Sequence, residues 1–185
     1  MILLFLALVV FAAVHLVPVF PGIKDGLIAR FGRKAFGALM SVTGLFCLAL
    51  LVAAWRNAPS DFAYVPGDWG RYANFALSLL GVICVSIFIF RGSLRQRLRF
   101  PLGIGVVLWA LGHLLANGDT RSLLLFGGLG ALAIAQMMMA AKHGVRPSPE
   151  VRSGHDLLSI VIGVALFGIL TQLHAFVVGV PILKL

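Results

Sequence analysis

The residues best suited to chemistry are three histidines that lie within long apolar stretches, His15, His113 and His174. An ionisable side chain is costly inside a membrane, so it indicates a functional site by default. Neutral imidazole is a suitable axial ligand for haem iron, because it brings no charge into apolar surroundings. A lone membrane histidine can also serve only as a hydrogen-bonding partner between helices, which stabilises by about 1 kcal/mol. The residues alone leave both interpretations open.

The stretch around His113 carries residues at steps of four, which places them on one face of a helix. They are Gly105, Trp109, His113 and Asn117, and the stretch closes in an Asn-Gly-Asp turn signal. We expect Trp109 to pack beside a cofactor bound at His113, and Asn117 to hydrogen-bond near it. The simpler alternative is an interfacial tryptophan and a helix cap.

Several other kinds of chemistry are excluded. No Asp, Glu, Lys or Arg lies inside the apolar stretches, which excludes paired-carboxylate catalysis there. Cys47 and Cys84 lie in separate stretches and form no CxxC pair, so we expect buried thiols and neither a paired-cysteine zinc site nor covalently attached haem. Methionines 137–139 would point in different directions on a helix, which favours packing over a copper site. His143 and His155 lie in a polar segment and are expected to be solvated.

The composition predicts an integral membrane protein. Of the 185 residues, 61% are hydrophobic and 11% are charged, whereas a soluble domain carries about a quarter charged residues. The apolar stretches suit about six helices of some 20 residues each. The predicted fold class is therefore all-α, a polytopic membrane helical bundle in a single domain over residues 1–185. The expected spans are 1–20, 35–55, 72–90, 101–116, 122–141 and 157–180.

The net charge of +9 is a topology signal and not a nucleic-acid-binding surface, because every Lys, Arg, Asp and Glu lies between or beyond the apolar stretches. In chain order the five loops carry +3, 0, +4, 0 and +1. Since basic loops stay in the cytoplasm, we expect the first, third and fifth loops there and both termini outside. The expected partner is the lipid bilayer.

Two sets of small residues are predicted to allow close helix contact, and the second set would also allow a dimer. They are Gly37, Ser41 and Gly44 in the second span, and Gly127, Ala131 and Ala135 in the fifth. Three aromatic residues around the second loop are expected to act as interfacial anchors, namely Tyr64, Trp69 and Tyr72.

Several segments together resemble the NnrU family, over essentially the whole chain. They are Val14-His15, Arg99-Phe-Pro-Leu, Leu108-Trp-Ala-Leu-Gly-His-Leu-Leu-Ala-Asn-Gly-Asp119, Leu123-Leu-Leu-Phe-Gly127 and His174-Ala-Phe-Val-Val-Gly-Val-Pro181. NnrU proteins are bacterial inner-membrane proteins associated with nitrite and nitric oxide metabolism in denitrification. They are homologous to the plant 15-cis-zeta-carotene isomerase, a haem b enzyme that isomerises a polyene double bond. The resemblance therefore implies a multi-pass protein of the bacterial inner membrane.

The resemblance also implies haem b as the cofactor, because His15 and His113 match the two haem ligands of the isomerase. Reduction of the iron would then weaken one ligand bond and open the iron to nitric oxide or another small apolar ligand. Haem-dependent cis-trans isomerisation of a carotenoid-like polyene is one alternative. A non-catalytic membrane accessory protein with structural histidines is another.

Two features bear on the implied ligand set. This chain has Phe100 where the family usually has the histidine of an Arg-His-Pro motif, so no role is carried over to that position. Membrane methyltransferases of the isoprenylcysteine type share that motif, but their cofactor-binding signature is absent here. A rise of 1.5 Å per residue places His15 about 8 Å and His113 about 18 Å from the predicted cytoplasmic ends of their spans. His113 and His174, which both fall nearer the outer face, are therefore the alternative pair.

Overall fold

The computed structural model describes residues 1–180 and 182 of the chain. This described part is built from helices and contains no strand, apart from one isolated bridge between Phe62 and Asp119. Five helices are long and apolar enough to cross a membrane, and a shorter apolar helix is the sixth candidate. The prediction of an all-α, polytopic membrane protein is confirmed. The chain divides into two compact units, Met1–Pro59 and a second that begins at Ser60.

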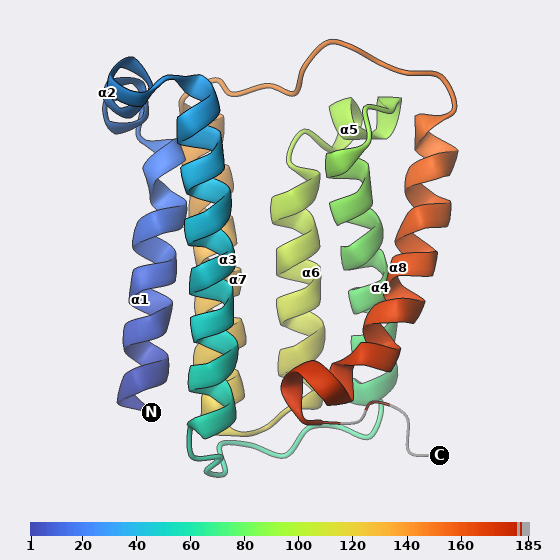
Figure 1. Ribbon diagram of the computed structural model, residues 1–185. Coiled ribbons are helices and arrows are strands. Elements are labelled where there is room, and N and C mark those ends of the chain that lie inside the picture. The colour runs from blue at the N-terminus through green and yellow to red at the C-terminus, as the bar shows by residue number, and fades with distance from the viewer. Residues whose placement is uncertain (181, 183–185) are drawn as a thin grey trace. The chain divides into compact units, whose positions relative to one another are not determined.

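The first unit consists of two long helices joined at one end by a short one (Figure 1). The long helices α1 and α3 pack against each other, and α2 contacts α3. In chain order its elements are α1 (Ile2–Leu16), a 3-10 turn (Val17–Val19), α2 (Pro21–Phe31) and α3 (Arg33–Asn57).

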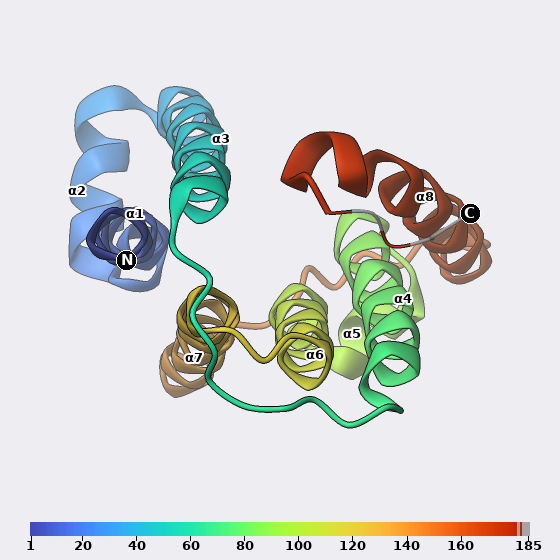
Figure 2. The same cartoon turned by 90° about the horizontal axis from the view of Figure 1, so that it is seen from below.

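The second unit is a row of four apolar helices, with one short helix between the two that come first in the chain. Seen along the helix axes, the order across the row is α7, α6, α4 and α8 (Figure 2). Helix α4 packs on both α6 and α8, while α6 packs on both α4 and α7. In chain order the elements are α4 (Gly70–Ile89), α5 (Ser93–Leu98), α6 (Pro101–Ala116), α7 (Thr120–Lys142) and α8 (His155–Val178).

Two segments that the sequence predicts as loops contain the short helices α2 and α5. The α2 segment reads as a loop because it mixes charged residues with two glycines, which are poor helix formers. The helix nevertheless begins at Pro21, whose fixed φ suits the first helical position. It ends at Phe31 and is capped by Gly32, which adopts a φ of 83° that a residue with a side chain rarely reaches.

Glycines allow the helices of the second unit to approach closely. A Cβ built on Gly81 of α4 would lie 2.8 Å from the carbonyl oxygen of Gly105 on α6, and one on Gly105 would lie 2.7 Å from that of Gly81. A Cβ on Gly163 of α8 would lie 2.8 Å from Cα of Ile83 on α4. Small residues at these crossings let the backbones pack directly, as in other membrane bundles. Both neighbours of α4 are therefore fixed in register by glycine.

The predicted small-residue strip on α7 does not serve packing within the second unit and is exposed, as the dimer alternative would require. A Cβ on Gly127 would meet nothing within 4 Å, and Ala131 and Ala135 are exposed. The buried side of α7 consists instead of Phe126, Leu129 and Ala133. Small residues occur all around this helix, so they cannot select a face; the large side chains do. In α3, Gly37 and Ser41 are likewise exposed, whereas Gly44 does face α1.

The surface is strongly apolar, as a lipid environment requires. Only 11% to 22% of the best apolar window of each long helix is buried within the protein. Cys47 and Cys84 are buried and unpaired, as predicted. The predicted multi-pass membrane protein is therefore supported by helix length, composition and exposure together.

Candidate functional site

His15 lies in the last turn of α1, and its imidazole is fixed on two sides. Nδ1 lies 2.8 Å from the carbonyl oxygen of Phe11, one turn earlier. The Phe11 ring stacks on the imidazole with centroids 3.8 Å apart and planes inclined by 13°. Across the helix pair, a Cβ at Gly44 would lie 3.8 Å from both Nε2 and Cε1 of His15. The imidazole therefore faces Gly44 of α3 at ordinary van der Waals distance.

His113 lies in the last turn of α6 and is held in the same way. Nδ1 lies 2.9 Å from the carbonyl oxygen of Trp109, one turn earlier. The ring of Phe126, which comes from the neighbouring helix α7, stacks on the imidazole at 4.4 Å and 29°. Trp109 completes the cluster, 4.9 Å from the His113 ring and 5.0 Å from the Phe126 ring. The predicted neighbourhood of Trp109 and His113 is therefore present.

The hydrogen bonds fix the protonation pattern of both imidazoles. A carbonyl oxygen can only accept a hydrogen bond, so the Nδ1 of each ring must carry the proton. In the neutral ring the lone pair then lies on Nε2. Metal-binding histidines are usually oriented in this way, because a backbone carbonyl that accepts from one ring nitrogen fixes the tautomer and raises the basicity of the other. In His15 and His113 alike, Nε2 is therefore the ring nitrogen that could bind a metal.

His174 differs from these two histidines. It is half-buried near the end of α8, and its Nδ1 donates to the carbonyl oxygen of Val180, 2.7 Å away and beyond the end of the helix. No aromatic ring is recorded against it in the described part of the chain. Like His15 and His113, His174 donates from Nδ1 to a backbone carbonyl, but it lacks the stacked phenylalanine that those two histidines have.

Asn117 acts on the helix end. Its backbone N–H donates to the carbonyl oxygen of His113 at 2.9 Å, and its side-chain Nδ2 donates to the same oxygen at 2.8 Å. These bonds satisfy a carbonyl that the end of a helix would otherwise leave without an intrahelical partner. The geometry matches the helix-cap alternative, and it ties Asn117 to the backbone of His113.

A segment that we call the Tyr64 strap, residues 61–66, crosses the turn after α6. The N–H groups of Ala63 and Tyr64 donate to the carbonyl oxygen of Gly118 at 2.9 and 3.0 Å, and Thr120 N–H donates to that of Asp61 at 2.9 Å. A Cβ at Gly118 would collide with the carbonyl group of Tyr64, so the turn requires glycine there. The strap explains why the Asn-Gly-Asp turn needs its central residue.

Tyr64 has a structural role that the sequence does not reveal. Its hydroxyl donates to the carbonyl oxygens of Leu114 and Asn117, at the end of α6. Trp69 and Tyr72, with 61% and 69% exposure, remain candidates for the predicted role of interfacial anchors. Sequence reasoning missed the capping function of Tyr64, because its partners lie about fifty positions further along the chain.

Replacing Tyr64 with phenylalanine is expected to destabilise the protein at neutral pH by about 1 kcal/mol, because the carbonyls at the end of α6 lose a donor. Burial, and then the charge of Asp119, raise the pKa of Tyr64 above 10.0. The folded protein therefore holds this proton more tightly than the unfolded chain does. The resulting stabilisation is complete below pH 10 and is lost as the pH rises through the higher folded pKa.

Thermal melts across the alkaline range test this prediction. Tyr64→Phe should melt below the wild type at neutral pH. Its melting temperature should also fall less than that of the wild type as the pH rises through the alkaline range. Tyr72→Phe, which changes an exposed ring, is the matched control and should keep the wild-type profile. A Tyr64→Phe variant with the wild-type melting temperature at neutral pH would contradict the capping role.

The remaining histidines lie apart from these clusters. His143 is exposed at the end of α7, as predicted. His155 is the first residue of α8 and is half-buried, with its ring 5.9 Å from that of Phe90, so the prediction of a solvated loop residue is wrong for it. Within the described residues, no group of three or more His, Cys, Asp or Glu side chains is arranged to hold a metal ion. Of the methionine run, Met137 packs against α6 at Gly103.

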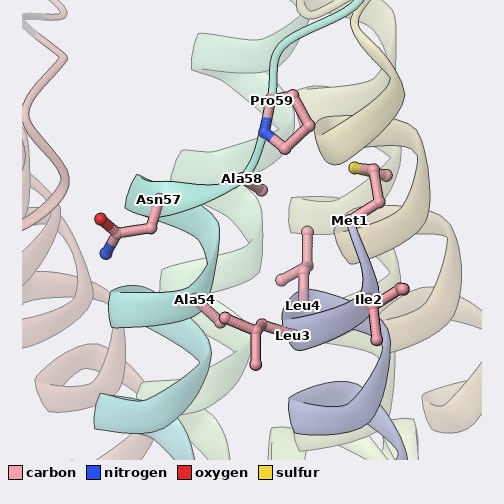
Figure 3. A pocket seen from close by; sticks show the side chains of 8 residues that line it. All are labelled: Met1, Ile2, Leu3, Leu4, Ala54, Asn57, Ala58 and Pro59. Atoms are coloured by element: carbon pink, nitrogen blue, oxygen red, sulfur yellow. The ribbon is translucent and has the colours of Figure 1, made fainter.

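The first unit also has an apolar hollow of roughly 400 Å³ at the end of α1 opposite to His15. Met1, Leu4, Ala54 and Pro59 are among its lining residues, and the Asn57 side chain points away from it (Figure 3). None of the predicted site residues lines this hollow. It is a separate feature of the helix pair.

Comparison with known proteins identifies one family. The family model described as NnrU protein matches residues 3–182, which spans both compact units. No curated protein and no solved structure matches the chain.

Proposed function

The chain belongs to the NnrU family, and on this premise we propose that it is an integral membrane haem b protein whose axial ligands are His15 and His113. The observation that carries the proposal is the matched setting of the two imidazoles. Each donates Nδ1–H to the carbonyl one turn earlier and stacks on a phenylalanine.

The residues present suit haem b better than a bare metal ion. Two neutral nitrogen donors match the two axial positions of haem iron, whose other four ligands belong to the porphyrin. A bare transition-metal site would need further protein ligands, and the described residues offer no such cluster. Gly44 is the residue that faces Nε2 of His15 from α3, and the rings of Trp109 and Phe126 form an apolar wall beside His113.

The protein's own residues then have distinct tasks. The carbonyls of Phe11 and Trp109 accept from Nδ1 and so fix the tautomer and orientation of each ring. Asn117 and Tyr64 fix the end of α6 and so the depth of His113. The phenylalanine and tryptophan rings exclude water. If bound, haem would be held by His15 and His113 and would supply a redox-active iron able to bind a small apolar ligand.

Nitric oxide is the ligand we propose to test first, since the resemblance to NnrU proteins associates them with nitrite and nitric oxide metabolism. The same resemblance leads us to propose the bacterial inner membrane as the location. The ligand and the location are both argued from the family and not from the geometry of the histidine sites.

Haem content of the purified protein tests the proposed function. Full-length protein from haem-replete cells, extracted in mild detergent, should show a Soret band, and a pyridine haemochrome assay should identify haem b at about one per chain. The control is a membrane protein of similar size without histidine in its spans, purified in parallel. Protein without a Soret band would contradict the proposal and favour the alternative of an accessory protein whose histidines are structural.

A further inference from the structure

The segment between α7 and α8 is bound firmly to α5 and its flanks. Arg152 N–H donates to the carbonyl oxygen of Arg91 at 2.7 Å. The Gln96 side chain donates from Nε2 to the carbonyl oxygens of Ser148 and Pro149, at 3.2 and 2.9 Å. Two basic segments that lie about fifty residues apart in the chain therefore form one surface. We call it the α5–linker surface, which comprises residues 91–99 and 142–156.

Arg99 adds a strained contact to this attachment. Its backbone has a φ of 56° and a ψ of −50°, and the flanking Phe100 N–H donates to the carbonyl oxygen of Leu98 at 2.6 Å. This is the rare γ-turn with positive φ, which is unfavourable for a residue with a side chain. The Arg99 Nε donates to the carbonyl oxygen of Val145 at 3.1 Å. Such strain persists only where the surroundings hold it, so the linker lies at a fixed position on α5.

The α5–linker surface has a large surplus of positive charge. Both of its acidic residues are already engaged: Glu150 pairs with Arg91, and Asp156 accepts from the Ser93 hydroxyl and from Leu94 N–H. A topology signal needs only the number of basic residues in a loop. Here the basic residues are also held in a fixed arrangement, which a topology signal does not require. The basic residues of the surface are Arg91, Arg95, Arg97, Arg99, Lys142, Arg146 and Arg152.

The position of this surface indicates what it binds. The Arg95 guanidinium lies 5.3 Å from the centroid of the Phe88 ring, near the end of the membrane-spanning helix α4. In the linker, Arg146 and Arg152 directly follow Val145 and Val151, each 50% exposed. Basic and apolar side chains that alternate at the end of membrane helices suit the boundary between headgroups and acyl chains. A ligand suited to this surface would combine negative charge with apolar surface.

We propose that the α5–linker surface binds the headgroups of anionic phospholipids. Its guanidinium groups would meet the phosphodiester, while the exposed valines contact the first part of the acyl chains. This surface lies on the side that positive-inside logic places in the cytoplasm, where anionic lipids attract such basic segments. The proposal does not depend on haem binding.

The test compares two double variants that remove equal charge. Arg146→Gln/Arg152→Gln changes two exposed linker cations, and Arg33→Gln/Lys34→Gln changes two exposed cations of the first unit. Each purified protein in detergent is titrated with phosphatidylglycerol or phosphatidylcholine, and bound lipid is counted by native mass spectrometry. Melting temperatures confirm that every variant is folded.

The wild type should bind phosphatidylglycerol in preference to phosphatidylcholine. Because each basic residue near an anionic surface contributes about a fivefold gain, the linker variant, which lacks two, should lose about 25-fold in affinity. The control variant should change less than about twofold. Equal losses in both variants would overturn the proposal in favour of diffuse attraction. Equal binding of the two lipids by the wild type, or full displacement of phosphatidylglycerol by inorganic phosphate, would also overturn it.

Discussion

Replacing His113 with alanine is expected to lower haem affinity by at least about 100-fold, because the substitution removes a ligand, whereas losing only a residue that supports a ligand costs about 10–100-fold. The imidazole of His113 is held against Trp109 and Phe126, so its loss also leaves a space beside those rings. Imidazole added during purification should occupy that space and restore part of the haem. Haem per chain, measured by the pyridine haemochrome assay, is the readout.

Two further variants separate loss of a ligand from loss of the fold. His113→Phe keeps a ring that can stack on Phe126 but has no nitrogen, and it should lose haem as His113→Ala does. His143→Ala changes an exposed histidine at the end of α7 and should retain wild-type haem. If His113→Phe kept its haem, the assignment of His113 as a ligand would be wrong.

Replacing Gly105 with leucine is expected to cost about 3 kcal/mol or more of stability, because overpacked sites force the backbone to move. A Cβ at this position would lie 2.7 Å from the carbonyl oxygen of Gly81, and backbone cannot rotate away as a side chain can. Helix α6 would have to shift from α4, and His113 would move with it. Thermal melting of the detergent-solubilised protein should show a large fall, accompanied by partial loss of haem.

Gly127→Leu is the matched control, since it introduces the same side chain into a membrane helix. No atom lies within 4 Å of a Cβ at Gly127, so the variant should melt close to the wild type. Equal melting temperatures for Gly105→Leu and Gly127→Leu would contradict the close crossing of α4 and α6.

The long helices could be predicted from the sequence because lipid exposure leaves a simple signal. Each expected span overlaps one observed helix, and the span 101–116 coincides with α6 (Pro101–Ala116). The short helices α2 and α5 could not be predicted in the same way. Their segments are polar and too short for a periodic pattern, and their stability comes from contacts with α3 and α8.

The candidate site was predictable in part, for a similar reason. An imidazole in an apolar stretch stands out, and steps of four correctly place Trp109 and Asn117 next to His113. Phe126 and Tyr64 were not assigned to the site, because they reach it from other segments of the chain. Periodicity within one helix carries no information about such contacts. The face of α7 that carries Phe126 was not predicted because small residues surround that helix.

The most direct test of the central claim is the coordination state of the ferric iron, read by electron paramagnetic resonance of the wild type, His15→Ala, His113→Ala and His174→Ala. If His15 and His113 are the axial ligands, the wild type and His174→Ala will give a six-coordinate, low-spin bis-histidine signal. His15→Ala and His113→Ala will each lose that signal, either through conversion to high spin or through loss of haem. A low-spin signal that survives in His15→Ala but disappears in His174→Ala would contradict the account and assign the second ligand to His174.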